Sequence, residues 1–211
     1  MVLGPANSGK MGHVLEWWKR RAADRPVLVA PTGPDSRELT VEMARVAGGV
    51  VGQSVAQTFD DLVRLVLDRS PRYASDLDLS LMMERLLEEA PLEALEGAAR
   101  LPGTSRALAA LILEFGESGR TPEELDGILS RWAALDPRSR PLARDLRRLL
   151  GGYADMCARL GLVTRPEAVR EAARAAGAWT RPVALYGFTS FTPGQRALIE
   201  ALSRRTEVLL T

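Results

Sequence analysis

The chain has 211 residues, 46% of them hydrophobic and 26% charged, and its formal net charge of +1 excludes a global attraction to nucleic acid or to an anionic membrane. One cysteine, Cys157, excludes an internal disulfide, and one histidine, His13, excludes a histidine metal cluster. No apolar run approaches the roughly 18 residues of a membrane span and no secretory leader is recognisable, so we expect a cytoplasmic protein with no membrane partner.

The chain begins with a pattern that fits a phosphate-binding loop at every position but the last. In G-x-x-x-x-G-K-[S/T] the glycines allow a tight turn, the backbone amides hold phosphates and the lysine reaches the outer phosphates. The final hydroxyl holds Mg²⁺, for which a thioether is a poor ligand. We therefore predict a site for ATP, ADP or another anion, with impaired Mg²⁺ binding; the alternative is that the lysine only satisfies nearby carbonyls. The loop comprises Gly4, Pro5, Ala6, Asn7, Ser8, Gly9, Lys10 and Met11.

Short apolar runs alternate with amphipathic segments at both ends of the chain. This alternation predicts βαβ units and a parallel sheet, as in a P-loop NTPase-like α/β fold with helices on both faces. We expect strands at residues 2–4, 27–30, 50–55, 183–188 and 207–211. Helices are expected from the phosphate loop to about Ala23, from an N-cap at Ser36 to Gly48, from Thr58 to Leu67, and from an N-cap at Thr192 to Ser203.

Between these α/β segments, from about Asp60 to Thr180, leucines recur at helical spacing. The pattern predicts an all-α insertion of roughly six helices with the leucine stripes in its core. Cys157 lies on one such stripe, where a buried small hydrophobe is expected. We assign residues 1–67 and 181–211 to the α/β core and 68–180 to the insertion. Breaks between helices are expected at Pro91, Pro102-Gly103, Gly119, Pro137 and Gly151-Gly152.

The insertion also contains the densest basic group of the chain. On a helix, four of its arginines share one side, where they can contact phosphates without reading bases. The alternative is an ordinary solvated face. The group consists of Arg138, Arg140, Arg144, Arg147 and Arg148.

The order of the segments resembles a known family. After the phosphate loop come a Val29-Ala30-Pro31-Thr32 strand end, then Thr58-Phe59-Asp60-Asp61-Leu62, the all-α insertion, and Tyr-Gly-Phe-Thr-Ser-Phe-Thr-Pro-Gly-Gln at 186–195. This order is similar to that of the N-terminal helicase-like region of the AddB (RexB) subunit of bacterial helicase–nucleases, which has the UvrD-like superfamily 1 fold. The resemblance covers 2–67 and 183–211 motif by motif, and the helical middle only in kind and position.

The resemblance also defines where this chain departs from active members. In those, the strand before the late loop ends in acidic residues, the first holding Mg²⁺ and the next assisting the attacking water. Here these positions are Tyr186 and Gly187, and a phenol is a poor Mg²⁺ ligand at neutral pH. Because the fold would bring Met11 and Tyr186 to the same metal, we interpret the centre as abandoned. Asp60 and Asp61 are alternative Mg²⁺ ligands, although Asp61 also suits a helix N-terminus.

From the resemblance we expect a non-catalytic helicase-like domain of a helicase–nuclease that processes DNA double-strand breaks. Such a domain binds single-stranded DNA or duplex ends, supports a partner motor subunit and precedes a RecB-like nuclease domain. Contacts with DNA are expected at Pro31, Thr32, Thr58 and Phe59, with Phe191 as a stacking surface. Each of these residues also suits an ordinary packing or capping role.

Two alternatives and one further expectation accompany this interpretation. The chain can be an active enzyme, either a P-loop ATPase or DNA helicase domain or a small nucleotide-dependent kinase-like protein. It can also be an assembly module that binds neither nucleotide nor DNA. Because residues 207–211 form an apolar strand that stops abruptly, we expect the chain to be the N-terminal piece of a longer protein.

Overall fold

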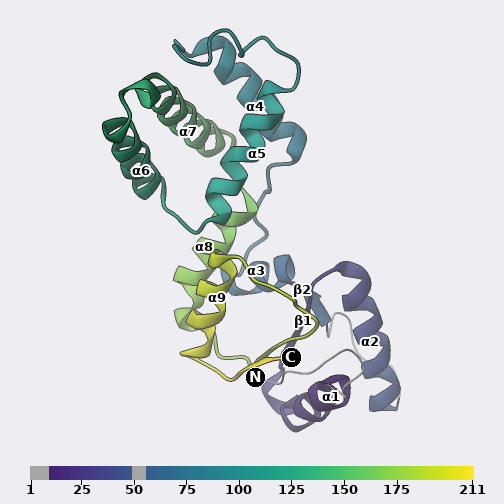
Figure 1. The fold of residues 1–211 in the computed structure, drawn as a ribbon. Helices are drawn as coiled ribbons and strands as arrows, with labels where there is room; N and C mark the ends of the chain where they lie inside the picture. The colour runs from purple at the N-terminus through teal and green to yellow at the C-terminus, as the bar shows by residue number, and fades with distance from the viewer. Residues whose placement is uncertain (1–9, 49–55) are drawn as a thin grey trace. The chain divides into compact units, whose positions relative to one another are not determined.

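The computed structural model describes residues 10–48 and 56–211 (Figure 1). The chain forms two compact units: unit 1 comprises Met1–Ser70 and Val169–Thr211, and unit 2 comprises Pro71–Ala168. The strands expected at 2–4 and 50–55 lie outside the described residues, as do Gly4, Pro5, Ala6, Asn7, Ser8 and Gly9 of the phosphate loop.

Unit 1 is built on a sheet of four parallel strands in the order β2-β1-β3-β4. The central pair is fully buried, as expected for strands covered on both faces, and Leu28 lies opposite both Ala56 and Ala184. The mixed α/β class with a parallel sheet, predicted from the alternation of segments, is confirmed. The strands are β1 (Val27–Ala30), β2 (Ala56–Thr58), β3 (Val183–Leu185) and β4 (Val208–Leu210).

Helices cover both faces of this sheet (Figure 1). On one face, α1 (Lys10–Arg20) and α2 (Gly33–Ala47) contribute side chains to a core cluster that also contains Leu28, Ala184 and Leu209 of the strands. On the other, α3 (Phe59–Leu67) packs on β1 and β2, and α9 (Pro193–Ser203) packs on β4. The helix α1, which follows the predicted phosphate loop, therefore packs on the sheet.

The cap of α2 differs from the prediction. Thr32, not Ser36, is the N-cap, and its hydroxyl accepts a hydrogen bond from the Asp35 amide at 3.3 Å. Ser36 lies inside the helix, where its hydroxyl donates to the Ala56 carbonyl of β2 at 2.7 Å. The sequence Thr-Gly-Pro-Asp supplies both a capping hydroxyl and a proline in the first helical turn, which favours the earlier start.

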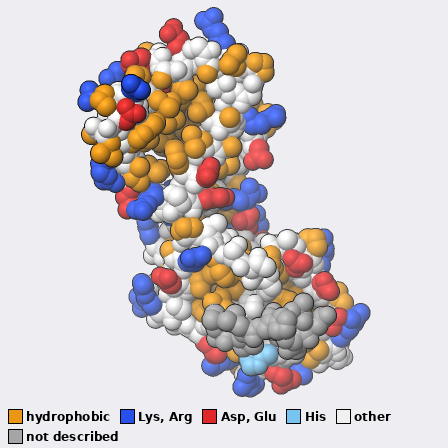
Figure 2. All heavy atoms as spheres, viewed as in Figure 1, with side chains coloured by type: hydrophobic (Ala, Val, Ile, Leu, Met, Phe, Trp, Pro, Cys, Tyr) orange, Lys and Arg blue, Asp and Glu red, His pale blue; other side chains and the backbone are white. Residues whose placement is uncertain are grey.

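Unit 2 is helical, with α4 (Asp76–Glu89), α5 (Thr104–Glu117), α6 (Pro122–Leu135) and α7 (Arg140–Leu160); α8 (Arg165–Ala175) begins here and ends in unit 1. Its core contains Met83, Leu149 and Tyr153 together with Cys157, which is buried as predicted. Burial raises the pKa of the Cys157 thiol. Figure 2 shows hydrophobic side chains gathered on the surface of this unit.

The break expected at Gly151-Gly152 does not occur, because both glycines lie within α7. A Cβ atom on Gly152 would lie 2.7 Å from Cδ2 of Leu86 on α4. The glycine therefore permits close packing of two helices, and it does not end one. Among the described residues, no helix has the length and apolar character needed to cross a bilayer.

Candidate functional site at the carboxyl edge of the sheet

The order of the strands puts a topological switch point between β1 and β3. From β1 the chain continues through α2 to β2 on one side, and from β3 it continues through α9 to β4 on the other. In open parallel sheets, ligands bind outside the carboxyl ends of two strands whose connections run in opposite directions like this. Here those ends carry Pro31 and Thr32 after β1, and Tyr186 and Gly187 after β3.

The residues after β1 and β3 approach each other closely. Gly187 has φ +80°, and a Cβ at this position would lie 3.8 Å from Cδ of Pro31. The Tyr186 amide donates to the Val29 carbonyl at 2.9 Å, so pairing with β1 continues one residue past β3. Pro31 and Thr32 are exposed. The structure thus brings predicted residues from both strand ends to one edge, with Thr32 also capping α2.

Three phenylalanines form a continuous aromatic cluster at this edge. The Phe59 and Phe188 rings meet edge to face with centroids 6.2 Å apart, and Phe188 stacks on Phe191 at 5.0 Å with an interplanar angle of 25°. Phe59 is only 6% exposed and is therefore the buried member of the cluster, whereas Phe188 and Phe191 are half-buried. Sequence reasoning missed Phe188, although its position three residues before Phe191 was a visible signal.

Thr58 and Asp61 serve the N-terminus of α3. Thr58 is the N-cap, and in a capping box its hydroxyl accepts from the Asp61 amide while Asp61 accepts from the Thr58 amide at 3.0 Å. Although partial burial acts to raise it, hydrogen bonds from Thr58 and the nearby Arg64 guanidinium hold the pKa of Asp61 below its usual value. Across residues 10–48 and 56–211, no three His, Cys, Asp or Glu side chains form a group suited to a metal ion.

Met11 and Tyr186, the two residues at which the sequence predicts a loss of metal ligands, pack against the same core cluster. Met11, in the first turn of α1, and Tyr186, just after β3, both pack as partly buried side chains against the cluster that contains Val14 of α1 and Ala184 of β3. The side chain of Lys10 is not among those described. These two positions, far apart in sequence, therefore contribute apolar contacts to the same core.

A polar contact fixes α1, and with it the position of Met11, to the sheet. The Trp17 indole N–H donates to the Glu207 carboxylate, at the start of β4, at 2.8 Å, and Arg21 forms an ion pair with the same carboxylate. The hydrogen bond from Trp17, with help from Arg21, holds the pKa of Glu207 below its usual range despite some burial. The contact links α1, which follows the predicted phosphate loop, to the amino-terminal end of β4.

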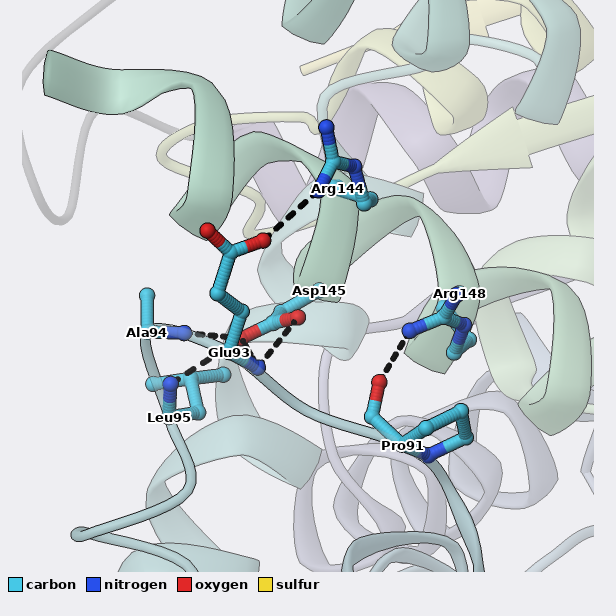
Figure 3. Close-up of polar contacts among 7 residues, drawn as sticks. All are labelled: Pro91, Glu93, Ala94, Leu95, Arg144, Asp145 and Arg148. Atoms are coloured by element: carbon cyan, nitrogen blue, oxygen red, sulfur yellow. Dashed lines mark hydrogen bonds and ion pairs between the residues drawn. The ribbon is translucent and has the colours of Figure 1, made fainter.

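The basic group of unit 2 makes specific contacts within the unit (Figure 3). Arg144 pairs with Glu93 at 2.6 Å, and Arg148 donates to the Pro91 carbonyl. Arg147 pairs with Asp126 through two hydrogen bonds, and Arg140 donates through Nε to the Ala133 carbonyl at 3.2 Å. Four of the five arginines therefore have partners on neighbouring segments, while all five remain exposed.

The sequence-predicted positions thus fall at two places: the strand ends of unit 1, where Pro31, Thr32, Phe59 and Phe191 gather, and the arginine-rich side of α7 in unit 2. Thr58 lies at the start of α3 and has a capping role. Comparison with known proteins adds no family to this description. No protein-family model matches the chain, and no curated protein matches it either.

Proposed function

We propose that this chain is a helicase-like domain that has lost ATP turnover and that acts in DNA binding and subunit assembly, within a helicase–nuclease of the AddB type that processes DNA double-strand breaks. The resemblance aligns Met11 and Tyr186 with the positions where active members place a hydroxyl and a carboxylate. One observation supports the proposal: both side chains pack on the same apolar cluster. A hard cation needs oxygen ligands at these positions.

The chemistry of these two side chains argues against an active P-loop ATPase. In phosphoryl transfer the metal ion bridges the outer phosphates and neutralises developing charge, so its ligands contribute directly to the rate. A thioether and a phenol that contribute to a hydrophobic core supply neither the charge nor the geometry. If one ligand is lost, the other can still hold the ion. If both are lost, the protein supplies no side-chain ligand to the metal ion at these two positions.

The exposed edge of the sheet supports the DNA-binding part of the proposal. Phe188 and Phe191 form a stacked pair. Phe188 directly follows Gly187, at which a Cβ would lie 3.8 Å from Cδ of Pro31, at the strand ends where open parallel sheets bind ligands. Stacking of a base on an aromatic side chain contributes about 1–3 kcal/mol and tolerates every base. The pair is therefore suited to single-stranded DNA of any sequence.

Replacement of Phe191 tests this part. We expect Phe191→Ala to weaken binding of a labelled single-stranded oligonucleotide by about tenfold at constant salt, since about 1–3 kcal/mol of stacking is lost. Phe115→Ala is the matched control, because Phe115 is a half-buried phenylalanine on α5 in unit 2. Equal affinities of the two variants, measured by fluorescence anisotropy, would show that the aromatic pair does not bind the oligonucleotide.

A further inference from the structure

Unit 2 has a hollow of about 330 Å³ between α6 and α7, which we call the α6–α7 hollow. It is lined by Ser130, Ala133 and Ala134 from α6 and by Arg140, Arg144 and Arg147 from α7. Small side chains leave the space open and make its floor apolar, while three guanidinium groups border it. Figure 2 shows basic side chains along the border of the part of the unit that α6 and α7 form.

The internal bonds of these arginines leave donors available. A guanidinium has five N–H groups. Arg147 uses Nε and Nη2 for Asp126, Arg144 uses Nη1 for Glu93, and Arg140 uses only Nε, for a carbonyl. With respect to the residues that the structure describes, the terminal nitrogens of Arg140 have no hydrogen-bond partner.

The same internal bonds hold the guanidinium groups in place. Arg147 is held by two hydrogen bonds to Asp126. Arg144 is held by its ion pair with Glu93, which Figure 3 shows. Arg140 is oriented by a carbonyl, which carries no net charge, so its positive charge is not neutralised by that contact. A cation positioned in this way loses little side-chain freedom when it binds an anion.

We propose that the α6–α7 hollow binds a phosphate group of a nucleic-acid strand, with the adjoining sugar on the alanine floor. Guanidinium groups match the geometry of phosphate oxygens, and contacts of this kind position a strand without reading its sequence. The hollow lies at the lower end of the roughly 300–1,000 Å³ typical of ligand pockets, which is more than a bare anion needs. The site is separate from the edge of the sheet, so it does not rest on the function proposed for that edge.

The test measures binding of a labelled oligonucleotide to the full chain over a series of salt concentrations. We expect Arg140→Gln to weaken binding about tenfold and to reduce the slope of log K against log salt by about one, as for one lost phosphate contact. Arg138→Gln is the matched control, because Arg138 is exposed, lies two residues away and does not line the hollow. Equal losses in the two variants would overturn the proposal, since they would reflect charge alone.

A second variant tests the hollow without replacing an arginine. Ala134→Glu puts a carboxylate into the hollow at an exposed helical position, and we expect it to abolish the Arg140-dependent part of the binding while thermal unfolding stays unchanged. Native affinity in this variant would contradict the proposal. Inorganic phosphate and a mononucleotide serve as competitors: displacement only at millimolar concentrations supports a strand as the ligand. A mononucleotide that binds as tightly as the oligonucleotide would overturn that assignment.

Discussion

The carboxylate of Asp145 on α7 is fully buried and binds the backbone of the loop between α4 and α5 (Figure 3). It accepts hydrogen bonds from the amides of Glu93, Ala94 and Leu95 at 2.8–3.1 Å. In a buried site, three amides directed at one carboxylate compensate for its loss of water, and they in turn depend on it. This residue connects the α4–α5 segment of unit 2 to α7.

Removal of that carboxylate should be costly. We expect Asp145→Ala to lower the free energy of unfolding by about 3 kcal/mol or more, because a single substitution leaves three amides without their acceptor. Asp155→Ala, at an exposed position on the same helix, should change it by less than about 0.5 kcal/mol. Chemical denaturation of both variants checks this, and similar values for the two would show that the loop finds other acceptors.

Side chains that cap helices were predictable where the local pattern was complete. Thr192 was expected as an N-cap and Thr58 at the start of a helix, and both begin capping boxes, because a Thr followed three residues later by Gln or Asp satisfies two amides at once. Ser36 was the wrong residue for α2, because the local Thr-Gly-Pro-Asp sequence caps the helix at Thr32. The bond from the Ser36 hydroxyl to a carbonyl on β2, 20 positions away in the chain, came only from the structure. Contacts of that range are not visible in a local pattern.

The capping box of α3 gives this helix a pH-dependent start. Because hydrogen bonds lower the pKa of Asp61 in the folded chain, the ionised carboxylate stabilises the fold above the unfolded-state pKa near 4, and this contribution disappears as the pH falls through the lower folded-state value. We expect Asp61→Asn to be less stable than the native chain at neutral pH, with the difference shrinking on acidification. A difference in unfolding free energy that stays constant with pH would contradict this.

The paired glycines of α7 offer a second prediction for a single element. Gly151→Ala should stabilise the chain by up to about 1 kcal/mol, since alanine favours a helix and nothing lies within 4 Å of the added Cβ. Gly152→Ala should gain less or lose stability, because Leu86 must move to make room. Thermal unfolding compares the two directly, and equal gains would argue against close packing of α4 and α7 at this point.

The same glycines show why one predicted boundary was wrong. By composition alone a Gly-Gly pair predicts a break, and nothing local distinguishes a helix end from a position where a second helix approaches. The breaks expected at Pro91, Pro102-Gly103, Gly119 and Pro137 do fall between α-helices, with Pro137 beginning a short 3₁₀ helix. Proline removes a helical amide, and Gly119 has φ +77°, a conformation that ends a helix. The helical character of the middle of the chain was therefore predictable, but its helix boundaries only in part.

At the scale of the whole molecule, the alternation of segments predicted a parallel sheet, but the order of its strands came only from the structure. That order puts the switch point between β1 and β3 and brings Pro31 close to Gly187. The aromatic cluster likewise joins Phe59 to residues more than a hundred positions later through Phe188. Contacts between residues far apart in the chain depend on tertiary packing. Individual candidate residues could therefore be predicted from the sequence, but which of them lie together could not.

The two units offer two separate surfaces for a nucleic-acid strand under our proposals. In unit 1 the surface is aromatic and lies at the strand ends, where stacking tolerates any base. In unit 2 it is cationic and lies between α6 and α7, where contacts would go to phosphate. Variants at the two surfaces should therefore differ in their salt dependence: Arg140→Gln lowers the slope, and Phe191→Ala lowers affinity with the slope unchanged.

Under our proposal, the predicted nucleotide site of this chain does not turn over ATP. The most direct test of this claim is steady-state ATP hydrolysis by the chain with Mg²⁺ and single-stranded DNA, measured beside Lys10→Ala, which removes the lysine of the phosphate loop. Because the resemblance aligns Met11 and Tyr186 with the two metal-binding positions, we predict the same background rate for both proteins. Hydrolysis by the native chain that disappears in Lys10→Ala would contradict the account and identify the chain as an active P-loop ATPase.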